Sequence, residues 1–372
     1  MIALVRVRLG PSGVFSVAGL PVPLRTLLAL QAAGASEVGF AGPAASAWRN
    51  VALRDGRAPR CSAFSLPPPD EAKLVVDQDL VLDTTAARGL LAVPGVFLLE
   101  GAPAAERSPF TAEECPAIPG VAAWARTPGE AALAEERLLA ALRKPQDGVV
   151  SRRLNRTLSL AVTRYLCRTR LTPNALSVAI LGVGLLGASL AARGTALGLG
   201  LGGVLFQAQS VLDGCDGELA RLTFRGSRAG EWIDTVGDDL TNYSFFAALG
   251  LGLQRAGLGR LPLVLSCVGV SAGVLSSVIA YRYLLRIGSG DLLKYPMSLG
   301  PEPGAQDSPR DRLAELLRPL FKRDFVVFAT MVAALCGPRA ALVALGAFAV
   351  GAQVTLLAVL RSEWSRRGER LP

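Results

Sequence analysis

The feature that most constrains this chain is a set of four aspartates within its apolar C-terminal half. From Pro173 onward the sequence is dominated by apolar runs long enough to cross a bilayer. A carboxylate at membrane depth costs about 2.5–3.5 kcal/mol on insertion scales, so such groups usually face a protein interior and serve a function. Asp213 and Asp216 share one helix face, and Asp234 and Asp238 share another. Two such faces opposed predict an oxygen cage for hard divalent cations.

Composition narrows the chemistry that these carboxylates can serve. The 372 residues include 39 Lys and Arg but no His, and the net charge is +9. The absence of His excludes His-based triads and imidazole bases, so acid–base work falls to carboxylates or Lys. The basic residues cluster beside apolar runs, which favours lipid headgroups and phosphorylated substrates over nucleic acid as partners. The six cysteines lack C-x-x-C spacing and are expected to be free thiols.

Residues 1–146 are expected to form a soluble α/β domain. Segments of β-like and of helical pattern alternate along them, which predicts a mostly parallel sheet. The β-like runs lie at 2–7, 37–40, 73–76 and 96–99, and the helical ones at 23–33 and 130–143. The first ten residues lack the separate apolar region of a signal peptide, so this domain is expected to stay in the cytosol.

Residues 147–372 are expected to form an all-α membrane domain of six transmembrane helices. The predicted spans are 174–192, 196–219, 233–254, 261–284, 324–337 and 339–361. An arginine-rich amphipathic segment at 151–170 precedes them and predicts an N-terminal interfacial helix, with a solvated linker helix as the alternative. Arg and Lys gather in alternate loops, so the positive-inside rule places the N-terminal domain, the C-terminus and the aspartates on the cytosolic side of a multi-pass protein.

The four aspartates belong to a longer pattern, D-x2-D-G-x2-A-R-x8-G-x3-D-x3-D. It runs from Asp213 to Asp238 and matches at every fixed position. The pattern resembles the signature of the CDP-alcohol phosphotransferase family, whose members are membrane enzymes. The resemblance implies transfer of a phosphoryl-alcohol from a CDP-alcohol donor to the hydroxyl of an alcohol or phospho-alcohol acceptor, with release of CMP.

The acidic residues of the pattern suit such a transfer. Two Mg²⁺ or Mn²⁺ ions can clamp the attacking and leaving oxygens, and the best candidate ligands are Asp213, Asp216 and Asp234. Asp238 is the candidate general base, and the resemblance implies that it also touches a metal. The neighbouring Asp239 points elsewhere on the helix, where a cap or a surface charge is expected.

Other residues are candidates for binding the CDP group. Gly217 and Ala220 lack bulk, so a nucleotide can approach the backbone, and Arg221 can pair with a phosphate oxygen. Gly230 allows two helices to approach closely. Asn174 opens the first span, where it either belongs to a helix-start signal or, as the resemblance implies, lies near the nucleotide.

A second resemblance concerns the junction between the two domains. The run from Lys144 to Arg156, K-P-x-D-G-x2-S-R-x2-N-R, is similar to the junction of bifunctional inositol-phosphate cytidylyltransferase/di-myo-inositol-phosphate-phosphate synthases. There, a cytosolic nucleotidyltransferase domain makes CDP-inositol, and the membrane domain joins it to inositol phosphate. The glycine-rich phosphate loop expected after the first strand is missing here, where only the short run 10–13 stands. We therefore expect a degenerate domain, in which Asp77 and Asp79 are ordinary strand-end residues, with an active cytidylyltransferase as the alternative.

The alcohols on both sides of the transfer stay open. The donor is either CDP-inositol or CDP-diacylglycerol, and the latter would make the protein a phospholipid head-group synthase. Arg282 and Arg323 are candidates for binding an acceptor phosphate, with positive-inside anchoring as the alternative. The resemblance implies a homodimer. A rival from another class is a non-enzymatic metal-binding or transport protein that uses the aspartate cage for ion passage.

Overall fold

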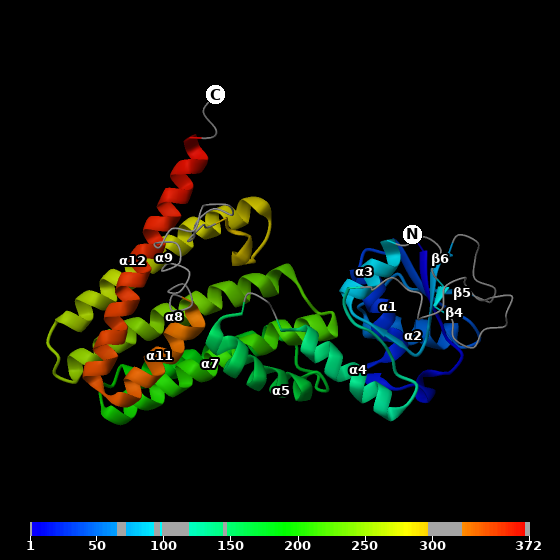
Figure 1. Ribbon diagram of the computed structural model, residues 1–372, viewed down its shortest axis with the longest axis horizontal. Coiled ribbons are helices and arrows are strands. Elements are labelled where there is room, and N and C mark those ends of the chain that lie inside the picture. Colours follow the sequence, from blue (N-terminus) through cyan, green and yellow to red (C-terminus); the bar gives the residue numbers. More distant parts are fainter. Residues whose placement is uncertain are drawn as a thin grey trace, which may run out of the picture. The chain divides into compact units, whose positions relative to one another are not determined.

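The fold is that of a computed structural model, which describes residues 2–64, 72–92, 97–98, 119–143, 147–296 and 322–368 (Figure 1). The chain divides into two compact units. The first comprises Met1–Lys144, Thr163–Leu171 and Glu218–Arg225, and the second comprises Pro145–Val162, Thr172–Gly217 and Gly226–Pro372. The predicted domain boundary after residue 146 lies outside the described residues.

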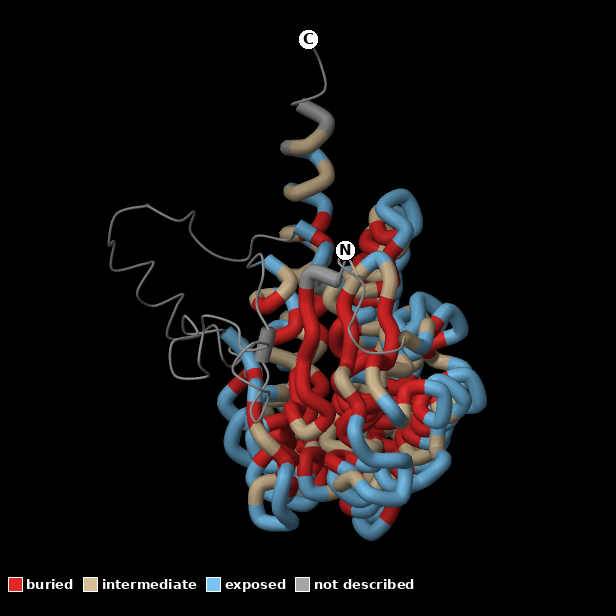
Figure 2. The backbone as a smooth tube through the Cα atoms, turned by 90° about the vertical axis from the view of Figure 1, so that its right-hand side faces the viewer, coloured by how far each residue is buried: buried red, intermediate tan, exposed pale blue. Residues whose placement is uncertain are grey.

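The first unit is built on a parallel sheet, as the sequence predicts. Its five strands are all parallel, in the order β5 (Ser62–Phe64), β4 (Glu37–Ala41), β1 (Ile2–Arg6), β6 (Ala72–Asp77) and β8 (Phe97–Leu98). The central strand β1 is a continuous apolar run, and Ala3, Leu4 and Val5 are fully buried. Such runs are typical of parallel strands covered on both faces. Figure 2 shows most of the central part of this sheet coloured as buried.

Helices and two short antiparallel strand pairs surround this sheet. The helices are α1 (Val22–Ala32), α2 (Ala45–Asp55), α3 (Thr84–Ala92) and α4 (Pro128–Ala141), and the pairs are β2 (Ser16–Val17) with β3 (Leu20–Pro21) and β7 (Leu80–Leu82) with β9 (Ala122–Trp124). Helix α4 begins at Thr127, whose hydroxyl accepts a hydrogen bond from the Glu130 amide at 3.2 Å. Helices α2 and α3 lie outside the segments expected from the sequence.

A buried arginine organises one part of the first unit. Arg25 on α1 is 1% exposed, and its guanidinium donates hydrogen bonds to the carbonyls of Val17, Ala18 and Leu222 at 2.8–3.1 Å. Burial lowers the pKa of Arg25 to about 10. These carbonyl partners offset part of the free energy that burying the charged group costs.

The second unit is helical. Its elements include a π-helical turn (Ser151–Asn155), α5 (Arg156–Leu166), α6 (Pro173–Ala191), α7 (Ala196–Thr223), α8 (Arg228–Arg255), α9 (Leu261–Ile287), α11 (Arg323–Cys336) and α12 (Pro338–Gly368), although the ends of α5 and α7 group with the first unit. Among the described residues, three helices are long and apolar enough to cross a membrane: Pro173–Ala191, Leu261–Ile287 and Pro338–Trp364. These helices mark the chain as a membrane protein.

The other three expected spans coincide with helices that do not meet this standard of length and composition. Helices α7 and α8 have 28 residues each but carry the acidic pattern, and α11 has only 14 residues. The prediction of an all-α part is therefore confirmed. Of the six predicted transmembrane helices, three are confirmed as helices long and apolar enough to cross a membrane.

Aromatic stacking and small residues bring these helices together. Phe206 of α7 stacks on Phe245 of α8 with ring centroids 4.0 Å apart, and Phe246 of α8 stacks on Phe348 of α12 at 3.7 Å. Helix α6 approaches α8 so closely that a Cβ on Gly184 would lie 2.2 Å from Thr241 Cγ2. Small residues at such crossings are the usual way in which membrane helices pack.

Candidate metal centre and active site

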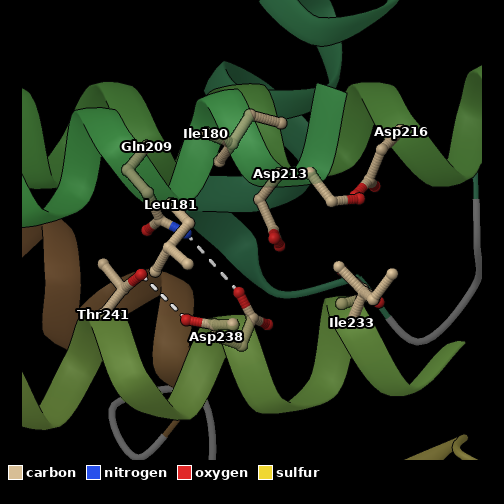
Figure 3. Close-up of a pocket in the computed structure, with 11 residues that line it drawn as sticks. Ile180, Leu181, Gln209, Asp213, Asp216, Ile233, Asp238 and Thr241 are labelled. Atoms are coloured by element: carbon tan, nitrogen blue, oxygen red, sulfur yellow. Dashed lines mark hydrogen bonds between the residues drawn. The ribbon is translucent and has the colours of Figure 1, made fainter. Parts of the chain in front are cut away.

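The aspartate pairs lie on two helices that face each other across a small pocket. Asp213 and Asp216 project from α7, and Asp234 and Asp238 project from α8. Figure 3 shows Asp213 and Asp238 pointing toward each other from the two helices. One carboxylate oxygen from each of Asp213, Asp234 and Asp238 lies within 4.8 Å of the others. These residues are far apart in sequence but form one acidic cluster.

Asp216 lines the same pocket, but its carboxylate is hydrogen-bonded to α6 and lies apart from the other three. Its side chain is 5% exposed, and the hydroxyl of Ser177 on α6 donates a hydrogen bond to Asp216 Oδ2. It is not one of the three carboxylates that converge most closely. The structure thus groups Asp238 with two predicted metal ligands, and it places the third predicted ligand at the edge of the pocket.

A guanidinium from α11 pairs with two carboxylates of the cluster. Arg323, the first residue of α11, donates from Nη2 to Asp238 Oδ1 at 2.7 Å and from Nη1 to Asp238 Oδ2. Its Nη1 also lies 3.4 Å from Asp213 Oδ2. A fork-shaped pair of this kind fixes the orientation of a carboxylate. Arg323, the candidate for binding an acceptor phosphate, is therefore paired with Asp238, the predicted base, and with Asp213, a predicted metal ligand.

Asp324, the residue after Arg323, contacts residues of the junction pattern 144–156. The backbone N–H of Ser151 donates to Asp324 Oδ2 at 2.7 Å. Gly148 lies so close that a Cβ there would be 2.2 Å from the Asp324 carboxylate oxygens. An ion pair between Arg156 and Asp147 at 2.9 Å closes the same turn. The junction pattern thus holds the start of α11, on which Arg323 stands.

The candidate residues for CDP binding lie in different parts of the fold. A Cβ on Gly230 would lie 2.9 Å from Asn174 Oδ1, so these two predicted residues are neighbours at the start of α8 and α6. Gly217 follows Asp216 on α7. Ala220 and Arg221 also lie on α7, in the stretch Glu218–Arg225 that groups with the first unit. Arg282 is exposed on α9.

The residues of the cluster fit a hard divalent cation. Every donor is a carboxylate oxygen, which suits Mg²⁺ or Mn²⁺ and suits softer metals poorly. Three carboxylates that converge in this way repel one another, and a bound cation would offset that repulsion.

Comparison with known proteins agrees with this arrangement. Residues 170–299, which include both aspartate pairs, match the family model described as CDP-alcohol phosphatidyltransferase. This matched segment, the transferase domain, thus resembles that family. The match spans helices α6 to α9, which carry the pocket.

Curated relatives of the chain share one description. Proteins called "Bifunctional IPC transferase and DIPP synthase" are 37% identical over 129 residues in Aquifex aeolicus, 39% over 144 in Thermococcus kodakarensis and 33% over 192 in Rubrobacter xylanophilus. The matches cover 34%, 38% and 45% of this chain. The chain spans 29%, 32% and 43% of the lengths of these relatives.

The transferase domain also contains a polar residue that its aspartate pattern does not include. Gln209 lies four residues before Asp213 on α7, lines the pocket, and places its Nε2 3.5 Å from Asp238 Oδ1 (Figure 3). The i,i+4 spacing to Asp213 within an apolar run is the sequence signal that could have identified it.

Asp239 makes a contact that the sequence analysis did not foresee. The Tyr281 hydroxyl on α9 donates to Asp239 Oδ2 at 2.6 Å. The expectation that Asp239 is a cap or a surface charge is therefore wrong, although it does point away from Asp238, as expected. It joins α8 to α9 within the transferase domain.

The α/β unit has an acidic pair of its own, Asp77 and Asp79, and Arg8 forms ion pairs with both at 3.0 and 3.8 Å. Asp77 is 2% exposed and forms an ion pair with Arg8 at 3.0 Å, while Gln78 Oε1 accepts from the backbone N–H groups of Arg8 and Leu9. Burial, and then the charge of Asp77, raises the pKa of Asp79. The side chain of Gln78 thus occupies the amides that follow β1, where a phosphate loop would have presented free ones.

Proposed function

We propose that the protein is a membrane-embedded CDP-alcohol phosphotransferase. It would move a phosphoryl-alcohol group from a CDP-alcohol to an acceptor hydroxyl and release CMP. The observation that carries this proposal is the convergence of Asp213, Asp234 and Asp238 from two helices within a segment that matches the CDP-alcohol phosphatidyltransferase model.

The carboxylates would divide two tasks. Asp213, Asp216 and Asp234, with a contribution from Asp238, would hold Mg²⁺ or Mn²⁺ in a two-metal site. When bound, these ions would offset the negative charge of the diphosphate. Ser177 and Arg323 would orient Asp216 and Asp238 through the hydrogen bonds that they make.

Asp238 would act as the general base. It would take the proton of the acceptor hydroxyl as that oxygen attacks the phosphorus next to the donor alcohol. The bond from that phosphorus to the bridging oxygen breaks, and CMP leaves with the bonding electron pair. The product is a phosphodiester, and the proton remains on the Asp238 carboxylate until solvent removes it.

The remaining candidate residues would bind substrates. Gly217, Ala220, Gly230 and Asn174 would line the path of the CDP group, and Arg221 would pair with a phosphate. The contact between Gly230 and Asn174 supports the part of this proposal that concerns the start of α8. Arg323 and Arg282 would bind the phosphate of a phospho-alcohol acceptor, and the place of Arg323 beside Asp238 favours it over the exposed Arg282.

The membrane arrangement is proposed to be that of six spans. Helices α6, α9 and α12 would be joined in the bilayer by α7, α8 and α11. The N-terminal domain, the C-terminus and the active site would lie on the cytosolic side, and the segment 151–166 would lie at the interface. We propose a domain boundary between residues 146 and 147, a homodimer, and no nucleic-acid partner.

The substrates are proposed from two observations. The names of the curated relatives favour CDP-inositol as donor and inositol phosphate as acceptor. The ion pair of Arg8 with Asp77 favours a degenerate α/β domain, which would leave the donor to another enzyme. CDP-diacylglycerol, and with it phospholipid head-group synthesis, is the alternative.

An assay of the full-length protein tests the proposal. Donors (CDP-inositol and CDP-diacylglycerol) are combined with a panel of alcohols and phospho-alcohols, and CMP formation is measured with Mg²⁺ and with EDTA. We expect CMP with at least one pair, only when the metal is present. Equilibrium binding of CDP with and without Mg²⁺ separates this proposal from an ion-transport protein, because an ion pathway has no need to bind CDP.

A further inference from the structure

One buried polar atom beside the pocket has no role in the chemistry described so far. Gln209 is 1% exposed, and its Oε1 has no hydrogen-bond partner among the described residues. A buried acceptor without a partner costs about 1–3 kcal/mol, so such atoms are rare unless something else binds them. Gln209 lines the pocket, and Figure 3 shows its amide directed into the space between α7 and α8.

The orientation of this amide follows from its neighbour. Gln209 faces Asp238 at 3.5 Å, and an ionised carboxylate can only accept hydrogen bonds, so the nitrogen of the amide must be the atom that faces it. The oxygen is then left free to accept a hydrogen bond from another group. Two oxygen acceptors, Asp238 Oδ1 and the buried Gln209 Oε1, thus lie on either side of one amide nitrogen beside the pocket.

Two hydroxyl groups on adjacent carbons match this pair of acceptors. One hydroxyl would give its proton to Asp238 and attack, and the other would donate to Gln209 Oε1. An ammonium group on the adjacent carbon could also donate to Gln209 Oε1, but its positive charge would lie close to the Arg323 guanidinium, which pairs with Asp238. An alcohol with no second donor on the adjacent carbon would leave Gln209 Oε1 unpaired.

We propose that Gln209 is a specificity residue that selects an acceptor carrying a vicinal diol. This inference rests on the proposed transfer reaction and specifies its acceptor class. The Gln209 hydrogen bond positions the acceptor, and the bond-forming chemistry remains with Asp238.

The test uses the full-length protein and acceptors that differ by one hydroxyl. Glycerol 3-phosphate is compared with 3-hydroxypropyl phosphate, and myo-inositol 1-phosphate with its monodeoxy analogues. L-Serine serves as an acceptor without a diol. CMP formation is measured with CDP-inositol and with CDP-diacylglycerol as donors, and the readout is the ratio of kcat/KM values within each acceptor pair.

We expect the wild-type protein to prefer the diol by roughly tenfold to 100-fold, the consequence of one unpaired buried acceptor. In Gln209→Met the ratio should fall toward one. Loss of the hydrogen bond to Asp238 lowers both rates in that variant, so the ratio is the informative quantity. If Gln209→Met does not fold, Gln209→Asn keeps the amide but withdraws it by one methylene, and it should lower the ratio partially.

Gln207 provides a matched control. It lies two residues earlier on α7, is 6% exposed, and also has an Oε1 without a partner in the described part of the chain, but its Nε2 donates to Asn155 at 2.9 Å and it does not line the pocket. Gln207→Met should leave the ratio unchanged.

Several outcomes would overturn the inference. A ratio that stays the same in Gln209→Met, or that falls equally in Gln207→Met, contradicts it. CMP formation with L-serine in preference to the diols leaves the transferase proposal intact and contradicts only the acceptor class. Absence of CMP with every acceptor contradicts both.

Discussion

The two acidic clusters of this protein differ in how their carboxylates are arranged. In the α/β unit, Asp77 is almost fully buried and is paired with Arg8, and Gln78 occupies the amides that follow β1. In the transferase domain, three carboxylates converge from α7 and α8, and two of them, Asp213 and Asp238, pair with Arg323. The first cluster holds two carboxylates beside one arginine, whereas the second brings three carboxylate oxygens within 4.8 Å of one another beside a pocket.

This difference shows that acidic residues at strand or helix ends do not by themselves define a metal site. Both clusters occur where the sequence suggests a nucleotide-handling enzyme. The second combines converging oxygens with a pocket lined by α6, α7 and α8. We therefore assign the chemistry to the helical part of the chain, and the following experiments test that assignment.

The largest effect is expected at the proposed base. Asp238→Asn should lower CMP formation by about 10³-fold, within the range usual for removal of a general base. The side chain keeps its shape, so size-exclusion chromatography in detergent should show a folded protein. Asp79→Asn in the α/β unit is the matched control and should leave the rate unchanged. An equal loss in both variants would remove the contrast between the clusters.

A smaller effect is expected on metal affinity. Asp234→Asn should weaken Mn²⁺ binding to the purified protein by at least about tenfold, because it removes one charged ligand from an oxygen site. Titration of Mn²⁺ followed by electron paramagnetic resonance measures this directly. Asp77→Asn should not change the titration, and any loss of Mn²⁺ there would place a metal in the α/β unit.

An effect on stability alone is expected at Arg8. Arg8→Met leaves Asp77 buried without its partner, but the Arg8 side chain is 46% exposed, so we expect a loss of only about 1 kcal/mol in the free energy of unfolding of the α/β unit. Alkylation of the buried Cys61 during a thermal ramp reports unfolding of this unit. The double variant Arg8→Met/Asp77→Asn should recover most of the loss, since both charges are then absent. Without such recovery, the ion pair would not be the cause.

We expect the α/β unit to have no cytidylyltransferase activity. The full-length protein, supplied with CTP, inositol 1-phosphate and Mg²⁺, should release no pyrophosphate above the blank. The amides that would hold a triphosphate already donate to Gln78 Oε1. Pyrophosphate release that Asp77→Asn abolishes would show two active centres in one chain.

Local spacing made the main features predictable from the sequence. The i,i+3 and i,i+4 separations of the aspartates were enough to place them on two helix faces, and short apolar runs such as the first four residues of β1 were enough to predict buried parallel strands. These features depend on neighbours within one or two turns, which the sequence shows directly.

The unpredicted features depend on contacts between distant residues. Arg323 and Asp238 are 85 positions apart, and Arg8 and Asp77 are 69 apart, so no local pattern joins them. Helix α2 buries only Ala45, Trp48 and Ala52, a narrow apolar stripe that gives a weak periodic signal. The three-span result likewise arises because the polar residues of α7 and α8 lower the apolar character of helices that are otherwise long enough.

The hydrogen bond between Tyr281 and Asp239 has a consequence for the geometry of the site. Asp238 and Asp239 are consecutive, so their side chains leave α8 about 100° apart around its axis. Tyr281 holds Asp239 against α9 and thereby sets the azimuth of α8. The bond restricts rotation of α8 about its own axis, so that Asp238 stays directed at the pocket while Asp239 stays directed away from it. The direction of the proposed base is thus determined in part by a tyrosine on the opposite side of the helix.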